Sequence, residues 1–291
     1  MIPGRGGRTR TADPRVPNAV RYRTAPHPEQ CEYNAKMTST SRNSQQSIYP
    51  PLYHYHHLTY QEDIPFWLDL AKDCPGPILE LGCGTGRVTL ALAQAEFKVF
   101  GLDYDLFMLR YLKSKIPSDH PLSVDLIQSD FRYFYLRKKF GLIFLPCNTF
   151  TTLDLQGRLS TLACVIQQLQ SKGIFAVSFA NPEFLKSLPA IGPREIEEVF
   201  LHPVDGEPVQ VYSSWERSQD LFSIEWCYDH LLPNGLVERY STVIRHHLLA
   251  VEDFLEEFAQ SGLECISLYG EFDRTSFEPG SPYLIILAQP V

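Results

Sequence analysis

Residues 78–87 read Ile-Leu-Glu-Leu-Gly-Cys-Gly-Thr-Gly-Arg, an apolar run that ends in three alternating glycines. The apolar run predicts a buried strand, and the pattern Val-Thr-Leu-Ala-Leu-Ala-Gln over residues 88–94 predicts a helix directly after it. Gly82, Gly84 and Gly86 lack a Cβ where the backbone must bend and where a ligand can lie against bare peptide groups. The unpaired N–H groups that open the helix would face that ligand. The stretch therefore predicts a strand–turn–helix binding site.

The spacing of the glycines and the positions of nearby acidic residues restrict the class of ligand that the site can bind. The glycines follow G-x-G-x-G rather than the G-x-G-x-x-G of dinucleotide enzymes, and Glu80 stands two residues before the first. A second apolar run, residues 97–103, ends in Asp103 about 20 residues past the glycines, where α/β nucleotide sites place the acid that binds the ribose. Asp105 is expected to cap the next helix.

These motifs resemble those of the class I S-adenosylmethionine-dependent methyltransferases. The family's second motif reads Gly-x-Asp-x-Ser-x-x-Met-Leu, and residues 101–109 depart from it only in using Asp105 for the capping serine. Two later apolar runs end in Asp130-Phe131 and in Leu145-Pro-Cys-Asn148, in the order of the family's third and fourth strands. The resemblance therefore implies S-adenosylmethionine as the cofactor.

The resemblance also implies which residues hold the cofactor. An acidic residue and the glycines would hold its methionine end, Asp103 the ribose, and Asp130 with the backbone N–H of Phe131 the adenine. The full expected set is Tyr53, Glu80, Gly82, Gly84, Gly86, Asp103, Tyr104, Met108, Asp130, Phe131 and Leu145.

The order of elements predicts one α/β domain over residues 48–291. Strands and helices alternate up to residue 179, which predicts a doubly wound, Rossmann-like parallel sheet. Residues 194–248 then show period-two patterns, at residues 209–216, 222–230 and 237–247, which predict an antiparallel β insertion. The parental pattern resumes after the insertion with a helix at 251–260 and strands at 263–268 and 283–288. The resemblance implies seven strands with the last antiparallel, and an insertion that roofs the active site.

The insertion carries the information about the methyl acceptor. Its arrangement resembles that of sugar-amine and glycine-type N-methyltransferases, which implies transfer to a nitrogen or oxygen of a small molecule. A nucleophile that bears a proton needs a base with a pKa near 7, so His247, His230 and Tyr228 of the insertion are the candidate catalytic residues. A cofactor-binding subunit or sensor without activity, or an enzyme of a related nucleotide cofactor, is the alternative. The acceptor, the atom methylated and the oligomeric state, including a homodimer, stay open.

Composition indicates a cytoplasmic protein that binds neither nucleic acid nor membrane. The net charge of -8 argues against nucleic-acid binding, because proteins that bind nucleic acid usually carry a basic stripe on their surface. No apolar run reaches the roughly 18 residues of a membrane span. Seven cysteines are scattered without a Cys-x-x-Cys pair or ligand-spaced histidines, so we expect reduced thiols and no metal site. His54, His56 and His57 are expected on the surface or on a lid.

Residues 1–47 are expected to be a disordered or non-native extension. The first 36 residues carry six arginines and almost no apolar periodicity, and we hypothesise that Met37 is the true start. Folded structure should begin near Tyr49, and the resemblance implies that Tyr53 lies across the cofactor. Asp63 is expected to cap the first helix of the domain, with Pro65 in its first turn.

Overall fold

The computed structural model describes residues 42–119 and 121–291, with side chains described from residue 48 onward. Residues 1–41 of the expected extension, and with them the hypothetical start at Met37, lie outside the described residues. The described chain opens with helix α2 (Arg42–His57), which begins before the domain boundary expected at residue 48. No helix in the described part is long and apolar enough to span a membrane.

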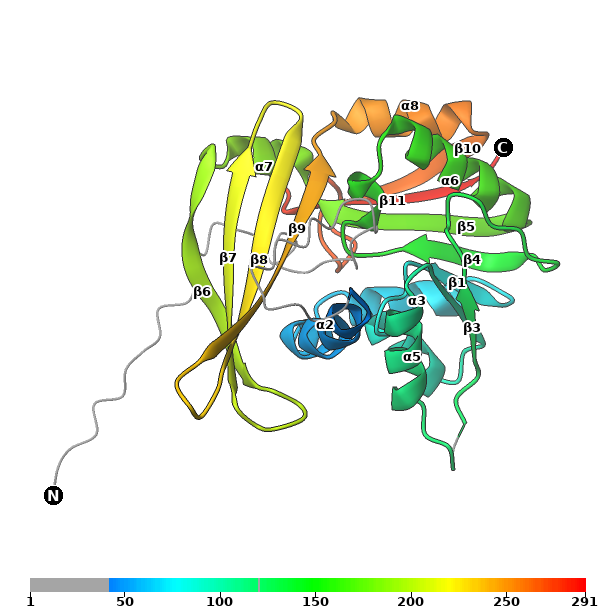
Figure 1. Cartoon of the computed structure of the whole chain (residues 1–291). Coiled ribbons are helices and arrows are strands. Elements are labelled where there is room, and N and C mark those ends of the chain that lie inside the picture. The colour runs from blue at the N-terminus through cyan, green and yellow to red at the C-terminus, as the bar shows by residue number, and fades with distance from the viewer. Residues whose placement is uncertain (1–41, 120) are drawn as a thin grey trace, which may run out of the picture.

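A seven-stranded sheet forms the centre of the protein (Figure 1). Its strand order is β10-β11-β5-β4-β1-β2-β3, and β11 runs antiparallel to both neighbours while the remaining pairs are parallel. The predicted doubly wound sheet with an antiparallel last strand is confirmed. Its strands are β1 (Ile78–Leu81), β2 (Val99–Asp103), β3 (Val124–Gln128), β4 (Phe140–Leu145), β5 (Leu169–Ala180), β10 (Leu263–Tyr269) and β11 (Tyr283–Pro290).

Helices cover both faces of this sheet because its strands are apolar on both sides. Along β5, Phe175 and Val177 pack on one face, while Ala176 and Ala180 pack on the other. The first face meets α6 (Leu155–Gln168) and α8 (Val251–Gln260), and the second meets α3 (Ile64–Asp73) and α4 (Arg87–Gln94). The remaining helical elements are α5 (Leu106–Lys115), the 3₁₀ turn η2 (Thr149–Thr152) and α7 (Pro182–Ser187).

A second, four-stranded antiparallel sheet, here called the roof, is inserted between α7 and α8 (Figure 1). It consists of β6 (Ile191–Leu201), β7 (Pro208–Arg217), β8 (Leu221–Leu231) and β9 (Val237–His247). The three period-two patterns correspond to β7, β8 and β9. Strand β6 gave no clear pattern because it is an edge strand whose register shifts twice along β7 and most of whose side chains are exposed.

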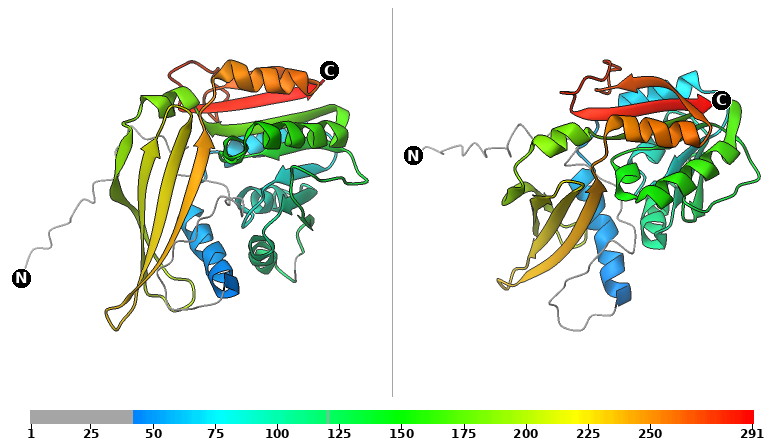
Figure 2. Two further views of the ribbon diagram at one scale, coloured as in Figure 1. Left: turned by 45° about the horizontal axis from the view of Figure 1, so that its top comes forward. Right: turned by 90° about the horizontal axis from the view of Figure 1, so that it is seen from above.

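Helix α2 lies between the roof and the helices that flank β1 to β3, as the two views of Figure 2 also show. It contacts α5 on one side and β6 on the other. Its Tyr49 ring stacks on Tyr240 of β9, with the ring centroids 5.0 Å apart, and meets the edge of Tyr228. The helix is therefore the element that joins the roof to the glycine-turn half of the domain.

Asp63 stands at the N-cap position of α3, but its side chain does not cap the helix. Its carboxylate instead accepts a hydrogen bond from Trp67 Nε1 at 2.9 Å and forms an ion pair with Arg87 of α4. An ion pair with a guanidinium is stronger than a neutral cap, so the long-range partner takes the carboxylate. The expectation of a cap was wrong here. Asp105 does cap α5, by accepting from the backbone of Phe107 and Met108.

Candidate active site

The glycine turn lies between β1 and α4 and borders a cavity of about 280 Å³. Gly82, Gly84 and Gly86 all have positive φ, at 68°, 53° and 87°. A Cβ on Gly86 would overlap Leu112 at 2.1 Å, whereas one on Gly84 would meet only Tyr53, at 3.8 Å. Gly86 therefore allows α4 to pack on α5, while the missing Cβ of Gly84 leaves room between the turn and the Tyr53 ring.

The cavity brings together part of the expected cofactor set. Tyr53, Glu80, Gly82 and Gly86 line it. The other expected residues do not line it: Gly84, Asp103, Tyr104, Met108, Asp130, Phe131 and Leu145. The cavity thus covers the turn expected to hold the methionine end. The lining also includes several residues that sequence reasoning did not assign: His54, His57, Arg87, Pro146 and Cys147.

Glu80 is a buried carboxylate at the base of this cavity. Burial raises its pKa to about 8, and the hydrogen bond that Thr89 donates to its Oε2 opposes that rise only in part. A buried carboxyl group with such a pKa gains by meeting a cation, because a positive neighbour offsets the cost of ionising it. Glu80 is therefore suited to the ammonium group of an amino-acid-like ligand.

Asp103 joins the end of β2 to the glycine turn. Its Oδ2 accepts from the N–H of Gly84 and its Oδ1 from the N–H of Asp105, both at 2.8 Å. Burial raises its pKa to about 7 in spite of these hydrogen bonds. Each carboxylate oxygen can accept a second hydrogen bond, so the group that shapes the turn keeps acceptors for a ribose.

The residues expected around the adenine lie beyond the cavity. Asp130 forms an ion pair with Arg132 at 2.7 Å, and Phe131 is buried against the glycine turn, with its ring 3.7 Å from where a Cβ of Gly82 would stand. Met108 and Leu145 are fully buried in the core. Tyr104 is half-buried, and its carbonyl accepts a hydrogen bond from Gln128. Their contacts to a cofactor stay a prediction.

The three catalytic candidates lie in different places, and none lines the cavity. His230 of β8 contacts Asp205 at the end of the roof that carries the β6–β7 and β8–β9 turns. His247 faces a small separate cavity beside Leu248, and burial lowers its pKa. Tyr228 points toward α2, where its hydroxyl and His56 Nδ1 are 3.0 Å apart.

A buried polar cluster connects this tyrosine to β6 and β7. His56 Nε2 lies 4.0 Å from Glu197 Oε2, and the other oxygen of Glu197 accepts a hydrogen bond from Ser213. The His56 ring packs on Trp226 at 4.5 Å and on His57 at 4.3 Å, and His57 lines the cavity. We call His56, Glu197, Ser213 and Tyr228 the acceptor cluster.

The acceptor cluster was missed in part by sequence reasoning. His56 and His57, expected on the surface or on a lid, are buried, because α2 presents them to the roof. Glu197 belongs to the run Glu195-Ile-Glu-Glu198 on the irregular strand β6, and nothing in this run predicted that its carboxylate lies beside His56. The aromatic and histidine density of residues 48–57 was the available clue for His56.

A second buried polar network fixes Arg87, the first residue of α4. Arg87 Nη2 donates to Asp63 at 2.8 Å and to the sulfur of Cys147 at 2.9 Å, and the Arg87 guanidinium lies over the Tyr60 ring. Cys147 follows β4 with a φ of 60° and borders the cavity. Burial raises the pKa of its thiol to about 12, so Cys147 is a neutral wall of the cavity rather than a nucleophile.

Comparison with known proteins agrees with this geometry. Residues 78–173, about one third of the chain, match the family model described as a methyltransferase domain. The chain is 24% identical over 228 residues to the putative methyltransferase YqeM of Bacillus subtilis (strain 168), an alignment that covers 77% of this chain and 87% of YqeM.

Two of the solved structures that share its fold illustrate the similarity. The crystal structure of an S-adenosylmethionine-dependent methyltransferase from Clostridium acetobutylicum has a TM-score of 0.70 at 18% identity and covers 83% of this chain and 98% of that one. The sugar N-methyltransferase KedS8 from Streptoalloteichus sp. has a TM-score of 0.66 at 18% identity and covers 87% and 97%. Residues 78–173 therefore match a methyltransferase domain, and the chain has the fold of the S-adenosylmethionine-dependent methyltransferases.

Proposed function

We propose that this protein transfers a methyl group from S-adenosylmethionine to the amine nitrogen of a small molecule, with a hydroxyl oxygen as the alternative acceptor. The observation that carries the choice of an amine is the acceptor cluster. It combines a carboxylate, a histidine and the aromatic ring of Tyr228, and the ring of Trp226 packs on its histidine. Aromatic faces and a carboxylate together favour a cationic amine.

The glycine turn fits the cofactor on observations of this structure. A Cβ at Gly84 would meet only the Tyr53 ring, so a ligand can approach the turn closely there, and Glu80 is a buried carboxylate suited to an ammonium group. The cavity of about 280 Å³ lies near the lower end of the size range of ligand pockets, roughly 300–1,000 Å³. Glu80 and the glycines would hold the methionine end, and Asp103 the ribose.

When bound, the cofactor supplies an electrophilic methyl carbon on its sulfonium, so the protein must orient the acceptor, exclude water and remove a proton. We assign the proton removal to the acceptor cluster. Tyr228 would take the proton of the amine while its own hydroxyl proton passes to His56 Nδ1. Glu197 would stabilise the resulting imidazolium and hold the proton of the resting imidazole on Nε2. The amine lone pair is then available for attack.

Access to the acceptor cluster requires a movement of α2. Tyr228 is 1% exposed and His56 is 3% exposed, because α2 covers Tyr228 and presents His56 to the roof. The cavity ends beside them at His57 and Tyr53, which are themselves residues of α2. An acceptor would therefore enter as α2 separates from the roof, next to the cavity proposed for the methionine end of the cofactor.

The relatives support an amine but do not identify it. KedS8 is described as a sugar N-methyltransferase, and a further structural neighbour at a TM-score of 0.59 is described as an amino pentose methyltransferase. We therefore infer an amino sugar, or an amine of similar size, as the acceptor class.

The first test is turnover of S-adenosylmethionine against paired acceptors. Each amino sugar is offered beside the sugar that carries a hydroxyl at the same carbon, and formation of S-adenosylhomocysteine is measured. We expect product with at least one amine and none with its paired hydroxyl compound. Product with the hydroxyl partner alone would move the proposal to oxygen. Tight cofactor binding without turnover on any member would favour the sensor hypothesis.

The ribose role of Asp103 predicts a loss of cofactor affinity in Asp103→Ala. Hydrogen bonds to a charged group contribute about 1.5–3 kcal/mol, which corresponds to roughly 10- to 100-fold in Kd. Calorimetry should be done near pH 8.5, because the pKa of Asp103 is about 7 and the wild-type carboxylate is ionised only above it.

The Asp103→Ala measurement has a matched control. Asp125→Ala removes an exposed carboxylate from the neighbouring strand β3, and we expect the wild-type Kd for it. A melting temperature measured without cofactor shows whether Asp103→Ala remains folded, since the residue also holds the glycine turn. A folded Asp103→Ala protein with unchanged affinity would contradict the ribose assignment.

A further inference from the structure

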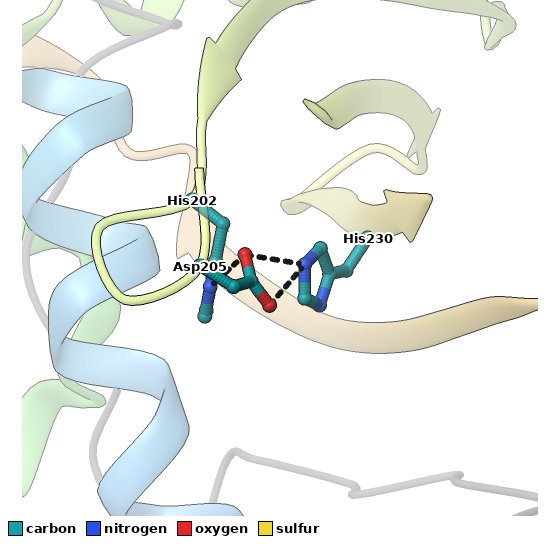
Figure 3. Close-up of side chains that lie close together, drawn as sticks. All are labelled: His202, Asp205 and His230. Carbon is teal, nitrogen blue, oxygen red and sulfur yellow. Dashed lines mark hydrogen bonds and ion pairs between the residues drawn. The ribbon is translucent and has the colours of Figure 1, made fainter. Parts of the chain in front are cut away.

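Three side chains at the turn end of the roof converge on one point (Figure 3). His202 directly follows β6, Asp205 lies in the turn between β6 and β7, and His230 lies on β8. Asp205 Oδ1 lies 3.0 Å from His202 Nδ1 and 3.2 Å from His230 Nε2, and its Oδ2 lies 3.2 Å from the same Nε2. All three candidate ligand atoms lie within 4.8 Å of one another.

The backbone holds two of these side chains in place. The turn closes through the N–H of His202, which donates to the carbonyl of Glu207 at 2.8 Å, and the N–H of Gly206, which donates to the carbonyl of His202 at 2.9 Å. The carboxylate of Asp205 accepts from the N–H of Glu207 at 3.1 Å, which fixes its orientation. His230 comes from the paired interior of the sheet, so the three groups are arranged before any ligand arrives.

The nitrogen-to-oxygen distances are close to those around a tetrahedral ion, and the two rings would splay apart to bind it. The two imidazole rings lie nearly parallel, with centroids 4.2 Å apart and 27° between their planes, and both direct a nitrogen at one carboxylate. Zinc–nitrogen and zinc–oxygen bonds of about 2.0–2.2 Å place neighbouring tetrahedral ligands roughly 3.3–3.5 Å apart. The observed nitrogen–oxygen separations of 3.0 and 3.2 Å need to open by only a few tenths of an ångström.

Glu238 on β9 supplies a second, independent feature. Its Oε2 lies 3.8 Å from His230 Nδ1, the nitrogen that faces away from Asp205. A carboxylate there favours the tautomer with the proton on Nδ1, which leaves the lone pair of Nε2 directed at the shared point. Histidine ligands of metals are usually held in this way by a carboxylate at the other nitrogen.

We propose that His202, Asp205 and His230 bind a divalent first-row transition ion such as Zn²⁺, with a water in the fourth position. Two imidazoles and one carboxylate are a common three-residue donor set for Zn²⁺. The histidine side chains are 15% and 11% exposed and that of Asp205 is 41% exposed, which leaves an entry for the ion on the side of the turn. The ion would fasten the β6–β7 turn to β8.

This site departs from the expectation of no metal, and it gives His230 a role other than proton transfer. The sequence spacing did not reveal it because Asp205 follows His202 by three residues, whereas His230 comes from a different strand. The proposal is independent of the methyl acceptor, since none of the three residues lines the cofactor cavity.

The test is titration of the full chain, without an affinity tag and stripped by a chelator, with ZnCl₂ in a calorimeter. We expect one ion per chain with a Kd in the micromolar range or tighter. His202→Ala, His230→Ala and Asp205→Asn should each weaken binding by more than 100-fold. Glu238→Gln should weaken it by roughly 10- to 100-fold, the usual cost of losing a partner of a ligand. Co²⁺ should give the visible absorption of a tetrahedral site in the wild type only.

Glu207→Gln is the matched control, because it removes the same charge from the same turn without removing a candidate ligand. It should bind Zn²⁺ like the wild type. Thermal melts without metal show whether each variant is folded. The proposal is overturned if the wild type does not bind Zn²⁺ at about 100 µM. It is equally overturned if folded Asp205→Asn or His230→Ala binds as tightly as the wild type, or if Glu207→Gln loses binding to the same extent as Asp205→Asn.

Discussion

Replacing His56 by alanine is expected to lower the turnover number for methyl transfer by about 10²- to 10⁴-fold, the range for loss of a general base. Tyr228 meets His56 Nδ1 at 3.0 Å, and Glu197 lies 4.0 Å from its other nitrogen. Alanine leaves the tyrosine without a group to take its proton. The cofactor Kd should stay within a few-fold of the wild type, because His56 does not line the cavity.

Two conservative variants separate proton transfer from packing. Tyr228→Phe removes the hydroxyl but keeps the ring, which contacts Tyr49 and His56. Glu197→Gln keeps the shape of the side chain but removes its charge. Both should lose turnover while retaining the wild-type melting temperature within a few degrees. In Glu197→Gln the pH at which turnover is half-maximal should move downward, because the imidazolium loses its carboxylate and the imidazole therefore stays unprotonated, and able to accept a proton, to a lower pH.

The same assay distinguishes the acceptor cluster from the bases predicted by sequence. His247→Ala and His230→Ala are measured beside His56→Ala with the acceptor found in the paired screen. If either of those variants lost turnover by 10²-fold or more while His56→Ala stayed near the wild type, the proton would leave by another path and the assignment to the acceptor cluster would be wrong.

Local sequence patterns predicted the seven-stranded sheet well. The strands of its cofactor half are apolar runs, and β2 ends in the recognisable residue Asp103, because a parallel sheet buries such runs on both faces. The helix at 251–260 was predicted at the bounds that the structure has, since its apolar positions repeat at helical spacing.

Long-range polar contacts could not be predicted in the same way. The partner of Asp63 is Arg87, and the neighbours of His56 are Tyr228 and Glu197, on different elements. His56 is buried only because the roof packs against α2, and the local sequence of α2 carries no information about the position of the roof. The candidate base of the reaction therefore came from the tertiary structure, whereas the cofactor turn came from the sequence.

Arg158→Ala is expected to lower the free energy of unfolding by about 3–5 kcal/mol, the cost of breaking a buried ion pair. Arg158 of α6 is 2% exposed and Glu257 of α8 is 6% exposed, and two hydrogen bonds of 2.7 Å join them. A third bond of 2.6 Å runs from Arg158 to the carbonyl of Leu153. Alanine leaves the Glu257 carboxylate buried without its cation, which is why the loss exceeds that of a surface pair.

Urea unfolding of three variants beside the wild type tests this expectation. Lys186→Ala breaks the partly exposed pair with Glu183 on α7 and should cost less than about 1 kcal/mol. The double variant Arg158→Met with Glu257→Leu should be close to the wild type or more stable, because well-packed apolar side chains can replace a buried pair at no net cost. The denaturant dependence should be the same in all variants, so that the midpoint alone reports stability. A loss in Arg158→Ala no larger than that in Lys186→Ala would mean that water reaches the pair. The ion pair between α6 and α8 would then contribute little to holding α8 against the sheet.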